Sequence, residues 1–527
     1  MAIAIPVPGK SDKSLWLVVG VCSLISLMSL GYFLTQNLVT TYGDGLSHLF
    51  IAKRMLESAT PGFAQAGAVW LPLPHVLMLT TIWNDNMYYS GLSGSIISMI
   101  SFVIASVFIY KIALVLTEKK SAGVVAALVF ALNPNVLYMQ AVPMTELPLM
   151  MFMAMGTYFL VKWAIAKNMS PKKELVYLAV MGIAAAGASL TRYEGWVFTL
   201  ALAVGVAYTG FRRSWSRSEI FSKVLLYFGF WPGAAIGGWV VWNLVIFGDP
   251  MYFTSGEYAK PSLWVTNTDP AIGNWSVSFQ TYGYAILDNI GPLMVALAAV
   301  GLFVYLLRTR LAPHALSPVT LLVYLPFFVY MLYAGQRPLH VEEISGDLNN
   351  VRFGLVMILP VAIFASYSVV IFRNSRLQWS LGALIILAAA ASSLSAYKQE
   401  NVVTLNDPLF LTQKAAYQRM DLTGSWLRDH YDGGRLLMEH FGNEVIFSRS
   451  HVPPRKLIWE GSFEIWDPAL VDPVGENITW IHMRVIPGFE DKVWKALHGS
   501  DMFTRCYSLV YKSIDSEVYK FSGCKEG

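Results

Sequence analysis

The sequence predicts a polytopic, mainly helical membrane protein with a small α/β domain after its last membrane span. The first observation is the composition: 55% of the 527 residues are hydrophobic, 14% are charged, and the mean hydropathy is +0.49. Such a chain is too apolar for a protein whose whole surface faces water. The second observation is that long apolar runs recur over residues 1–400 and stop at about Asp407. The third is that residues 401–527 are more polar and alternate helical with strand patterns.

The apolar runs predict about eleven membrane spans, since a spanning helix needs about 20 mostly apolar residues. The first run is expected to be a retained helix, because no small-residue cleavage site follows it. No internal repeat is evident, which disfavours transporter folds built from inverted repeats. The runs begin near Leu15, Tyr88, Gly123, Leu147, Leu175, Trp196, Val224, Ile286, Pro318, Phe353 and Trp379.

The basic residues predict how the chain is oriented in the plasma membrane or an equivalent membrane. Lys and Arg gather in every second connection, which marks the cytoplasmic side. The N-terminus is therefore expected in the cytoplasm and, with an odd number of spans, the C-terminal domain outside it. The alternate connections are poor in Lys and Arg and are expected to face outward; they are residues 37–86, 139–146, 191–195, 248–285 and 335–352. The basic clusters are Lys10 and Lys13, Lys119 and Lys120, Lys167 with Lys172 and Lys173, Arg212 with Arg213 and Arg217, Arg308 and Arg310, and Arg373 and Arg376.

The charge distribution gives no sign of a nucleic-acid partner. The formal net charge is only +4, and the basic residues form short clusters between apolar runs instead of one continuous stripe. Membrane lipids are the partners that this pattern indicates.

The C-terminal domain shows its elements in three stretches. "KAAYQRMDLTGSWLRDHY" predicts a helix, "NITWIHMRVI" a buried strand, and "RCYSLVYKSIDSEVYKF" two strands around a polar turn. The three cysteines, Cys22, Cys506 and Cys524, match no metal-binding spacing. A disulfide between the last two is compatible with an oxidising compartment, but their spacing alone leaves it open.

The first outward connection carries the first candidate for chemistry, Asp44 in "TTYGDGLSHLFIAKRM". Loops of about 50 residues with helical pieces of their own are often functional. Charged groups near a membrane are costly when dehydrated, so acidic residues gathered at one membrane depth predict a polar cavity. The alternative is that Asp44 only caps a helix beginning near Leu46. The two roles are compatible.

Other outward connections repeat this pattern at the same predicted face. Glu146 in "AVPMTELPLM" begins a span, where the alternative is a partner for the helix dipole only. Arg192, Tyr193 and Glu194 occupy the tight turn "SLTRYEGW", where the arginine and the glutamate could merely neutralise each other. Arg352 in "GDLNNVRFGLVMILP" stands at the outer entrance of a span, where snorkelling toward water is the alternative.

These residue types suit an enzyme that takes a sugar from a lipid phosphate. A carboxylate is needed to receive the proton of the acceptor hydroxyl, which contributes roughly a hundredfold to ten-thousandfold, and Asp44 is the candidate. An arginine is needed to hold the phosphate as the glycosidic bond breaks, and Arg192 and Arg352 are the candidates. Glu146 could orient the acceptor, hold a basic partner, or join Asp44 around a divalent cation such as Mg²⁺ or Mn²⁺. The sequence does not choose among these roles.

The ordered motifs resemble those of a known group of enzymes. "YGDGLSHLFIAKRM" resembles the first-loop motif of the type C glycosyltransferases of the protein O-mannosyltransferase and lipid A aminoarabinose transferase group. "MTELP", "LTRYEG" and "VRFGLVMILP" are similar to later signatures of these enzymes and occur in the expected order. The resemblance covers roughly residues 12–397.

The resemblance implies a helical bundle that uses a polyprenyl-phosphate-linked sugar. It further implies inverting transfer to a glycan, lipid or protein acceptor outside the cytoplasm, with Asp44 as the base and Glu146 as the acid of the second outward connection. Gly45 follows Asp44 where many members have a second acid. A metal bound by adjacent first-loop carboxylates is therefore less expected, and no metal ligands are assigned.

Three further first-loop residues are candidates for binding substrate. His48 lies four residues after Asp44 and would share its helix face, so it could bond the carboxylate or contact the acceptor. Trp70 and His75 in "AVWLPLPH" could line the cavity. The alternatives are a buried or interfacial histidine for His48 and an interfacial anchor for Trp70.

Later connections supply the remaining candidates for substrate binding. Tyr193 and Glu194 accompany Arg192, and "QRPLHVEEISGDLNN" offers His340 and Glu342. Solvated loop charges are the alternative for this last pair. Residues 248–285 could form a lid over the donor.

Two other functions remain open at this point. A transporter or lipid flippase would also be polytopic, but its essential polar groups would be expected halfway through the spans. A non-catalytic assembly protein would keep any sugar product unchanged when Asp44 is replaced by asparagine.

Overall fold

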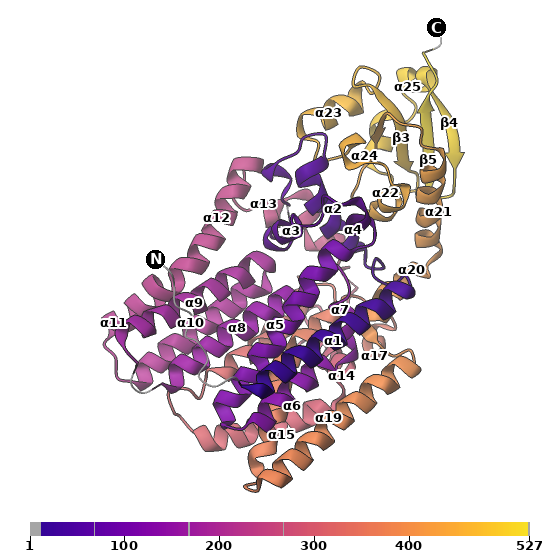
Figure 1. The fold of residues 1–527 in the computed structure, drawn as a ribbon. Helices are drawn as coiled ribbons and strands as arrows, with labels where there is room; N and C mark the ends of the chain where they lie inside the picture. The colour runs from indigo at the N-terminus through magenta and orange to yellow at the C-terminus, as the bar shows by residue number, and fades with distance from the viewer. Residues whose placement is uncertain (1–11, 68, 167–168, 267, 525–527) are drawn as a thin grey trace. The chain divides into compact units, whose positions relative to one another are not determined.

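The chain folds into two units, each built from segments that are not contiguous in sequence (Figure 1). The computed structural model describes residues 12–524 except 68, 167–168 and 267. Lys10 and Lys167, two of the predicted cytoplasmic basic residues, lie outside the described residues. The first unit comprises Met1–Leu38, Ala68–Pro74 and Ser95–Asp407, and the second comprises Val39–Gly67, His75–Gly94 and Pro408–Gly527.

The first unit is a helical bundle, as the sequence predicts. Within the described residues, nine helices are long and apolar enough to cross a membrane. Two shorter apolar helices, Lys120–Ala131 and Pro318–Tyr333, correspond to the other two predicted runs. The nine are Lys13–Thr35 (α1), Leu92–Thr117 (α5), Glu146–Ile165 (α8), Pro171–Thr191 (α9), Glu194–Arg212 (α10), Arg217–Phe247 (α11, a π-helical turn and α12), Pro292–Thr309 (α15), Val351–Ile371 (α18 between two 3₁₀ turns) and Ser375–Thr412 (α19 and α20).

The helices of the first unit pack in a continuous bundle. α8 packs against both α9 and α10, and these three run side by side in Figure 1. α15 packs closely against α18, because Gly301 brings the two backbones together. The individual helices within the composite spans, together with the shorter helices of this unit, are Lys120–Ala131 (α6), Pro134–Met139 (α7), Arg217–Ser222 (α11), Phe230–Phe247 (α12), Tyr252–Ser255 (α13), Trp275–Ile290 (α14), Tyr324–Tyr333 (α16), Glu342–Ser345 (α17), Ile358–Tyr367 (α18), Ser375–Lys398 (α19) and Val403–Thr412 (α20).

Two glycines shape the backbone around the predicted functional residues. Gly195 follows the two-residue connection between α9 and α10, and a Cβ there would lie 2.1 Å from the Ala188 carbonyl oxygen. Gly354 lies in the 3₁₀ turn Val351–Met357 against α14, where a Cβ would lie 2.3 Å from the Ala285 carbonyl oxygen. The sequence therefore needs glycine at both places for this close packing.

The second unit combines the first long loop with the C-terminal segment. The loop forms Gly43–Glu57 (α2), Asp85–Tyr89 (α4) and part of Leu73–Met78 (α3). The C-terminal segment forms a five-stranded sheet in the order β2-β1-β3-β5-β4, with β1, β2 and β3 parallel and β4 and β5 antiparallel. Its elements are Ala415–His430 (α21), Arg435–Leu437 (β1), Glu444–Ser450 (α22), Leu457–Ile458 (β2), Phe463–Val471 (α23), Ile478–Arg484 (β3), Lys492–Leu497 (α24), Asp501–Cys506 (α25), Tyr507–Lys512 (β4) and Ser516–Phe521 (β5). The predicted α/β fold and its quoted helix and strands are confirmed.

The sheet has a hydrophobic core on each face. Adjacent strand residues point to opposite faces, so Trp480 belongs to one buried cluster and Ile481 to the other. Phe50 of α2 is part of the same cluster as Trp480. The helix that carries Asp44 therefore packs onto the C-terminal sheet through its own apolar residues.

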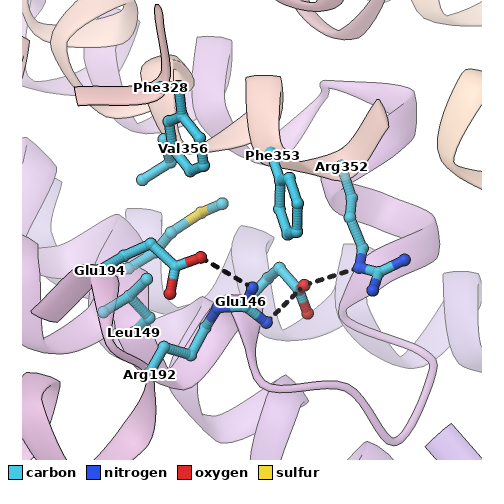
Figure 2. Close-up of a pocket in the computed structure, with 9 residues that line it drawn as sticks. Glu146, Leu149, Arg192, Glu194, Phe328, Arg352, Phe353 and Val356 are labelled. Carbon is cyan, nitrogen blue, oxygen red and sulfur yellow. Dashed lines mark hydrogen bonds and ion pairs between the residues drawn. The ribbon is translucent and has the colours of Figure 1, made fainter. Parts of the chain in front are cut away.

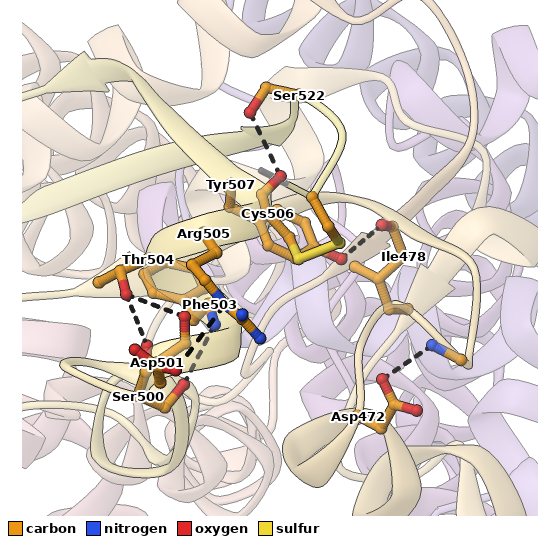
Figure 3. The surroundings of a disulfide bond; sticks show 12 residues. Asp472, Ile478, Ser500, Asp501, Phe503, Thr504, Arg505, Cys506, Tyr507 and Ser522 are labelled. Atoms are coloured by element: carbon orange, nitrogen blue, oxygen red, sulfur yellow. Dashed lines mark hydrogen bonds and ion pairs between the residues drawn. A yellow bond between two sulfur atoms is a disulfide. The ribbon is translucent and has the colours of Figure 1, made fainter. Parts of the chain in front are cut away.

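A disulfide joins Cys506 to Cys524, 18 residues apart, and so closes the segment that contains β4 and β5 (Figure 3). Ser522 reinforces this closure by donating its backbone N–H to the Cys506 carbonyl oxygen at 2.9 Å. Closing a loop of this length restricts the unfolded chain by about 3 kcal/mol. The structure thus contains the cystine that the sequence left open.

Candidate active site

Two arginines and one glutamate, far apart in the sequence, meet at one end of the helical bundle. Arg192 donates from Nη1 to Glu146 Oε1 at 2.9 Å, and Arg352 donates from Nε to the same oxygen at 3.1 Å (Figure 2). Glu146 begins α8, Arg192 follows α9, and Arg352 is the second residue of the span Val351–Ile371. These contacts gather the ends of three spans around one carboxylate oxygen.

Further polar groups complete this cluster. Arg192 also donates to Thr145 Oγ1 at 2.9 Å and to Glu194 Oε1 at 3.1 Å. Arg352 Nη1 lies 3.8 Å from Asp407 Oδ2. Four members of the cluster are buried, namely Glu146, Glu194, Arg352 and Asp407. Isolated charges at such positions would be costly, so their mutual pairing makes the buried cluster stable.

Asp407 is a member of this cluster that the sequence reasoning missed. It lies in α20, where the apolar runs end, and the sequence predicts there only the beginning of the polar segment. An aspartate at the end of a membrane span was an available signal, because ionisable residues at such positions are costly unless they have a partner. The partner, Arg352, is 55 positions away and could not be inferred from spacing.

The cluster lines a cavity. The other lining residues are apolar, and the space open to the centre of a water molecule is about 20 Å³, which exceeds what one water needs. Glu146 Oε2 is buried and has no hydrogen-bond partner among the residues that the structure describes. Buried carboxylate oxygens normally accept hydrogen bonds, so this atom is suited to a ligand hydroxyl or amine. The full lining is Glu146, Leu149, Met150, Arg192, Glu194, Phe328, Arg352, Phe353 and Val356.

A third arginine lies at the same aromatic ring. The guanidinium carbons of Arg192, Arg352 and Arg337 are 5.7, 5.6 and 6.0 Å from the centre of the Phe353 ring. The ring face attracts cations at this distance. Arg337 Nε is buried without a hydrogen-bond partner among the described residues. Arg337 was also missed, although it stands in the same outward connection as Arg352.

Tyr193 contacts the first long loop within the first unit. Its hydroxyl donates to the Val69 carbonyl oxygen at 2.7 Å, and its ring stacks on Phe253. Leu71 packs in the same aromatic cluster. Trp70 therefore lies between Val69 and Leu71, which both contact residues of the bundle.

His340 and Glu342 lie in a separate group. His340 Nδ1 is 2.9 Å from Asp347 Oδ1, and its Nε2 is 3.4 Å from Asp269 Oδ2. The hydrogen bond with Asp269, followed by that with Asp347, raises the pKa of His340 above its ordinary value. Glu342 is exposed in α17. The structure thus joins His340 to two loop carboxylates and leaves Glu342 at the surface.

Asp44 and two histidines lie in the second unit. Asp44 is the second residue of α2, whose N-cap is Tyr42, so the alternative that Asp44 caps a helix beginning near Leu46 is wrong. The helix starts three residues earlier than that alternative required. One turn after Asp44, His48 Nδ1 lies 2.9 Å from Nε2 of His75, and His75 Nδ1 lies 3.2 Å from the Ala66 carbonyl oxygen. Both histidines are buried.

The C-terminal segment places another carboxylate near Asp44. α22 packs against α2, and its first residue, Glu444, interacts electrostatically with Asp44. Burial, together with the Asp44 charge, raises the pKa of the Glu444 carboxyl to about 6. Glu444 follows the carboxyl end of the parallel strand β1, an edge where α/β sheets commonly bind ligands. The sequence shows no motif at Glu444, because its position near Asp44 depends on the packing of two chain segments about 400 residues apart.

The side chains give no assigned metal centre. Among the residues that the structure describes, no group of three or more His, Cys, Asp or Glu side chains is placed to hold a metal ion.

Comparison with known proteins supports the relation that the motifs indicate. Residues 79–232 match the family model described as dolichyl-phosphate-mannose-protein mannosyltransferase. No curated protein matches the chain at a significant level.

Solved structures share the fold over almost the whole chain. ArnT from Cupriavidus metallidurans, bound to undecaprenyl phosphate, is similar over 96% of this chain and 97% of that one, with 13% identity and a TM-score of 0.58. The Archaeoglobus fulgidus oligosaccharyltransferase tethered with an acceptor peptide is similar over 97% of this chain and 74% of that one, with 10% identity and a TM-score of 0.53. The same archaeal enzyme in complex with an inhibitory peptide and a dolichol-phosphate is similar over 89% of this chain and 69% of that one, with 10% identity and a TM-score of 0.51.

The resemblance predicted from the motifs is confirmed: this chain has the fold of the type C glycosyltransferases, and part of its membrane region matches their dolichyl-phosphate-mannose-protein mannosyltransferase model.

Proposed function

We propose that the chain is an inverting glycosyltransferase that moves one sugar from a polyprenyl phosphate to a glycan, lipid or protein acceptor outside the cytoplasm. The observation that carries the proposal is the contact of Arg192 and Arg352 with one oxygen of Glu146 beside a cavity. The fold supports it, since structures of that fold have been solved with undecaprenyl phosphate and with dolichol-phosphate.

Arg192 and Arg352 are assigned to the donor phosphate. Arg192 has five N–H groups, of which hydrogen bonds to Thr145, Glu146 and Glu194 use three. Two N–H groups therefore remain to donate to phosphate oxygens, and a guanidinium can do so bidentately. Glu146 positions both arginines, and its buried Oε2 is assigned to a substrate hydroxyl or amine.

The reaction is a single displacement. The acceptor hydroxyl oxygen attacks the anomeric carbon from the side opposite the phosphate, and the bond from that carbon to the phosphate oxygen breaks. The electron pair of that bond stays on the polyprenyl phosphate, whose growing charge the arginines stabilise. The hydroxyl proton passes to Asp44, the base that the sequence predicts. Inversion follows from the single attack.

The remaining sequence candidates are assigned to substrate binding. We place His48 on the acceptor side with Asp44, where His75 acts through its contact with His48, and we place Tyr193, Glu194 and Trp70 with the donor. Tyr193 and Trp70 suit this assignment, because aromatic faces fit sugar rings and isoprenoid chains. His340 and Glu342 stay predictions for the donor sugar.

The orientation of the chain is part of this proposal. The N-terminus is assigned to the cytoplasm and the C-terminal segment to the opposite side. The Cys506–Cys524 disulfide supports this assignment, because disulfides persist in oxidising compartments outside the cytoplasm.

Turnover of a radiolabelled polyprenyl-phosphate sugar by the purified protein tests the proposal. Mannose is the first sugar to try, with a membrane extract as the source of acceptor. Asp44→Asn is expected to lower turnover by about a hundredfold to ten-thousandfold, because it removes the base. Asp429→Asn, at an exposed aspartate of the C-terminal segment, is the matched control and should behave like the parent. Equal turnover by all three proteins would remove Asp44 from the mechanism.

A further inference from the structure

We infer that His48 is a second proton acceptor acting with Asp44, and that His75 is a positioning residue that orients the basic nitrogen of His48. The inference rests on the proposed function for the reaction in which the proton is released. Its structural part, the arrangement of the two imidazoles, stands independently of that reaction.

The hydrogen-bond network assigns a single tautomer to His75. The Ala66 carbonyl oxygen can only accept, so His75 Nδ1, 3.2 Å away, carries the hydrogen. Burial first, and then the nearby His48 and Arg54 charges, lower the pKa of His75 well below its ordinary value. His75 is therefore neutral, and its Nε2 has a lone pair.

This lone pair fixes the tautomer of His48 in turn. His75 Nε2 accepts, so His48 Nδ1, 2.9 Å away, must donate. Nδ1 of His48 keeps its hydrogen in both charge states of the ring. Nε2 is consequently the single nitrogen of His48 that takes up or releases a proton.

The place of His48 on α2 connects this nitrogen with Asp44. The two residues are four positions apart in one helix, so they share a face. A carboxylate oxygen and an imidazole Nε2 can each take up a proton, so a proton that reaches this helix face can be held by the two residues together. The hydroxyl proton released in the reaction is such a proton. The O–H bond of the acceptor breaks, and the proton ends between Asp44 and His48 Nε2 with no other group gained or lost.

The charged groups around this pair act in opposite directions. The Asp44 carboxylate favours a protonated His48, and the Nδ1–H of that ring remains bonded to His75 Nε2. The Arg54 guanidinium, on the same helix, acts against positive charge on His75. Glu444, the first residue of α22, interacts electrostatically with Asp44.

Two replacements of His75 separate positioning from simple packing. His75→Gln keeps an oxygen that accepts from His48 Nδ1 and an amide that donates to Ala66, whereas His75→Leu keeps neither. His75→Leu is expected to lower kcat at least about tenfold with little change in KM and to alter the pH profile of kcat. His75→Gln is expected to restore most of the rate. His482→Gln, at another fully buried histidine of this unit bonded to Ser516, is the control for loss of a buried imidazole and should keep the parent's profile.

Two results would overturn the inference. One is that His75→Leu retains the parent's rate and pH profile; the other is that Gln and Leu lower the rate equally, which indicates packing alone. The ¹⁵N spectrum of histidine-labelled parent, assigned with His48→Gln, provides a readout without substrate. It should show His48 with hydrogen on Nδ1 when neutral, and a neutral His48 with hydrogen on Nε2 would contradict the inference. A parent that transfers no sugar but shows the expected tautomer would count against the proposed function instead.

Discussion

At the scale of single residues, Glu146 keeps two buried arginines together. Its Oε1 accepts from both guanidinium groups, and the carboxylate and Arg352 are almost fully buried. Removing one partner from a buried ion pair leaves the other charge without compensation. The negative charge of Glu146 is therefore needed for stability as well as for orienting the arginines.

Glu146→Gln is expected to destabilise the protein by about 3 kcal/mol, the usual cost of breaking a buried ion pair. Thermal unfolding of the purified protein in detergent measures this as a lower midpoint. Glu219→Gln is the control, since Glu219 is an exposed residue of a helix cap and should change the midpoint only slightly. Equal midpoints for the parent and Glu146→Gln would show that the arginines do not depend on this carboxylate.

Glu460 is expected to make stability depend on pH. Burial raises the pKa of its carboxyl from 4.5 to about 7, while the backbone N–H groups of His440 and Phe441 donate to it. Because the folded pKa is the higher one, the stabilisation is fully present below about pH 4.5 and is lost as the pH rises through 7. The loss amounts to about 3 kcal/mol.

Glu460→Gln tests this dependence, because glutamine does not titrate. Between pH 4.5 and pH 8, the thermal midpoint of the parent should fall relative to that of Glu460→Gln. The change with pH is the readout, since the amide also alters the hydrogen bonds at every pH. A constant difference would contradict the expected titration.

The residues of the cluster were partly predictable from the sequence. Glu146, Arg192, Glu194 and Arg352 stood out because polar residues beside long apolar runs are costly without partners. The same argument did not identify Arg337, which stands further from a span. The contact of His48 with His75 was not predictable, because it depends on how the loop between α2 and α3 folds back.

At the scale of elements, the apolar runs predicted the spans well because a bilayer fixes the length of a spanning helix. The runs near Gly123 and Pro318 became helices of ordinary length instead of full spans. Hydropathy cannot distinguish these cases, since a run of buried bundle residues is as apolar as one facing lipid. The 3₁₀ turn that carries Arg352 was likewise invisible, because it depends on the close packing of Gly354 against α14.

The packing of α15 against α18 provides a test at this scale. A Cβ on Gly301 would lie 1.8 Å from the Phe364 carbonyl oxygen, so the helices must separate to admit alanine. Gly301→Ala is expected to destabilise the protein by at least about 1 to 3 kcal/mol. Gly283→Ala in α14 is the control, because nothing lies within 4 Å of its added methyl. Similar thermal midpoints for both variants would contradict the close helix contact.

At the scale of the whole molecule, the chain combines a membrane bundle with a unit that two distant segments build. α2 and the C-terminal sheet share one hydrophobic cluster, in which Phe50 packs with Phe447 and Trp459. The apolar pattern indicates where a segment is buried but not which distant segment covers it. This is why the sequence predicted a separate C-terminal domain at residues 401–527 and gave no sign that the loop helix packs on its sheet.

The proposed orientation predicts where the cystine can be reached. In intact cells, a membrane-impermeant reductant followed by an impermeant thiol reagent should label Cys506 and Cys524, because the C-terminal segment is assigned outside the cytoplasm. A cysteine placed at Ser214, in a predicted cytoplasmic connection, should be labelled only after the membrane is opened. If only the cysteine at position 214 were labelled in intact cells, the topology would be the opposite of the one proposed.

Binding of undecaprenyl phosphate tests most directly whether the arginine cluster holds a lipid phosphate. Native mass spectrometry of the purified protein in lipid nanodiscs can measure it for the parent, for Arg352→Gln and for Arg376→Gln, an exposed arginine in a predicted cytoplasmic connection. We expect Arg352→Gln to weaken binding at least about tenfold, since a charge-assisted contact contributes about 1.5 to 3 kcal/mol. Arg376→Gln should bind like the parent. Equal binding by all three proteins would contradict the assignment of the phosphate to this cluster.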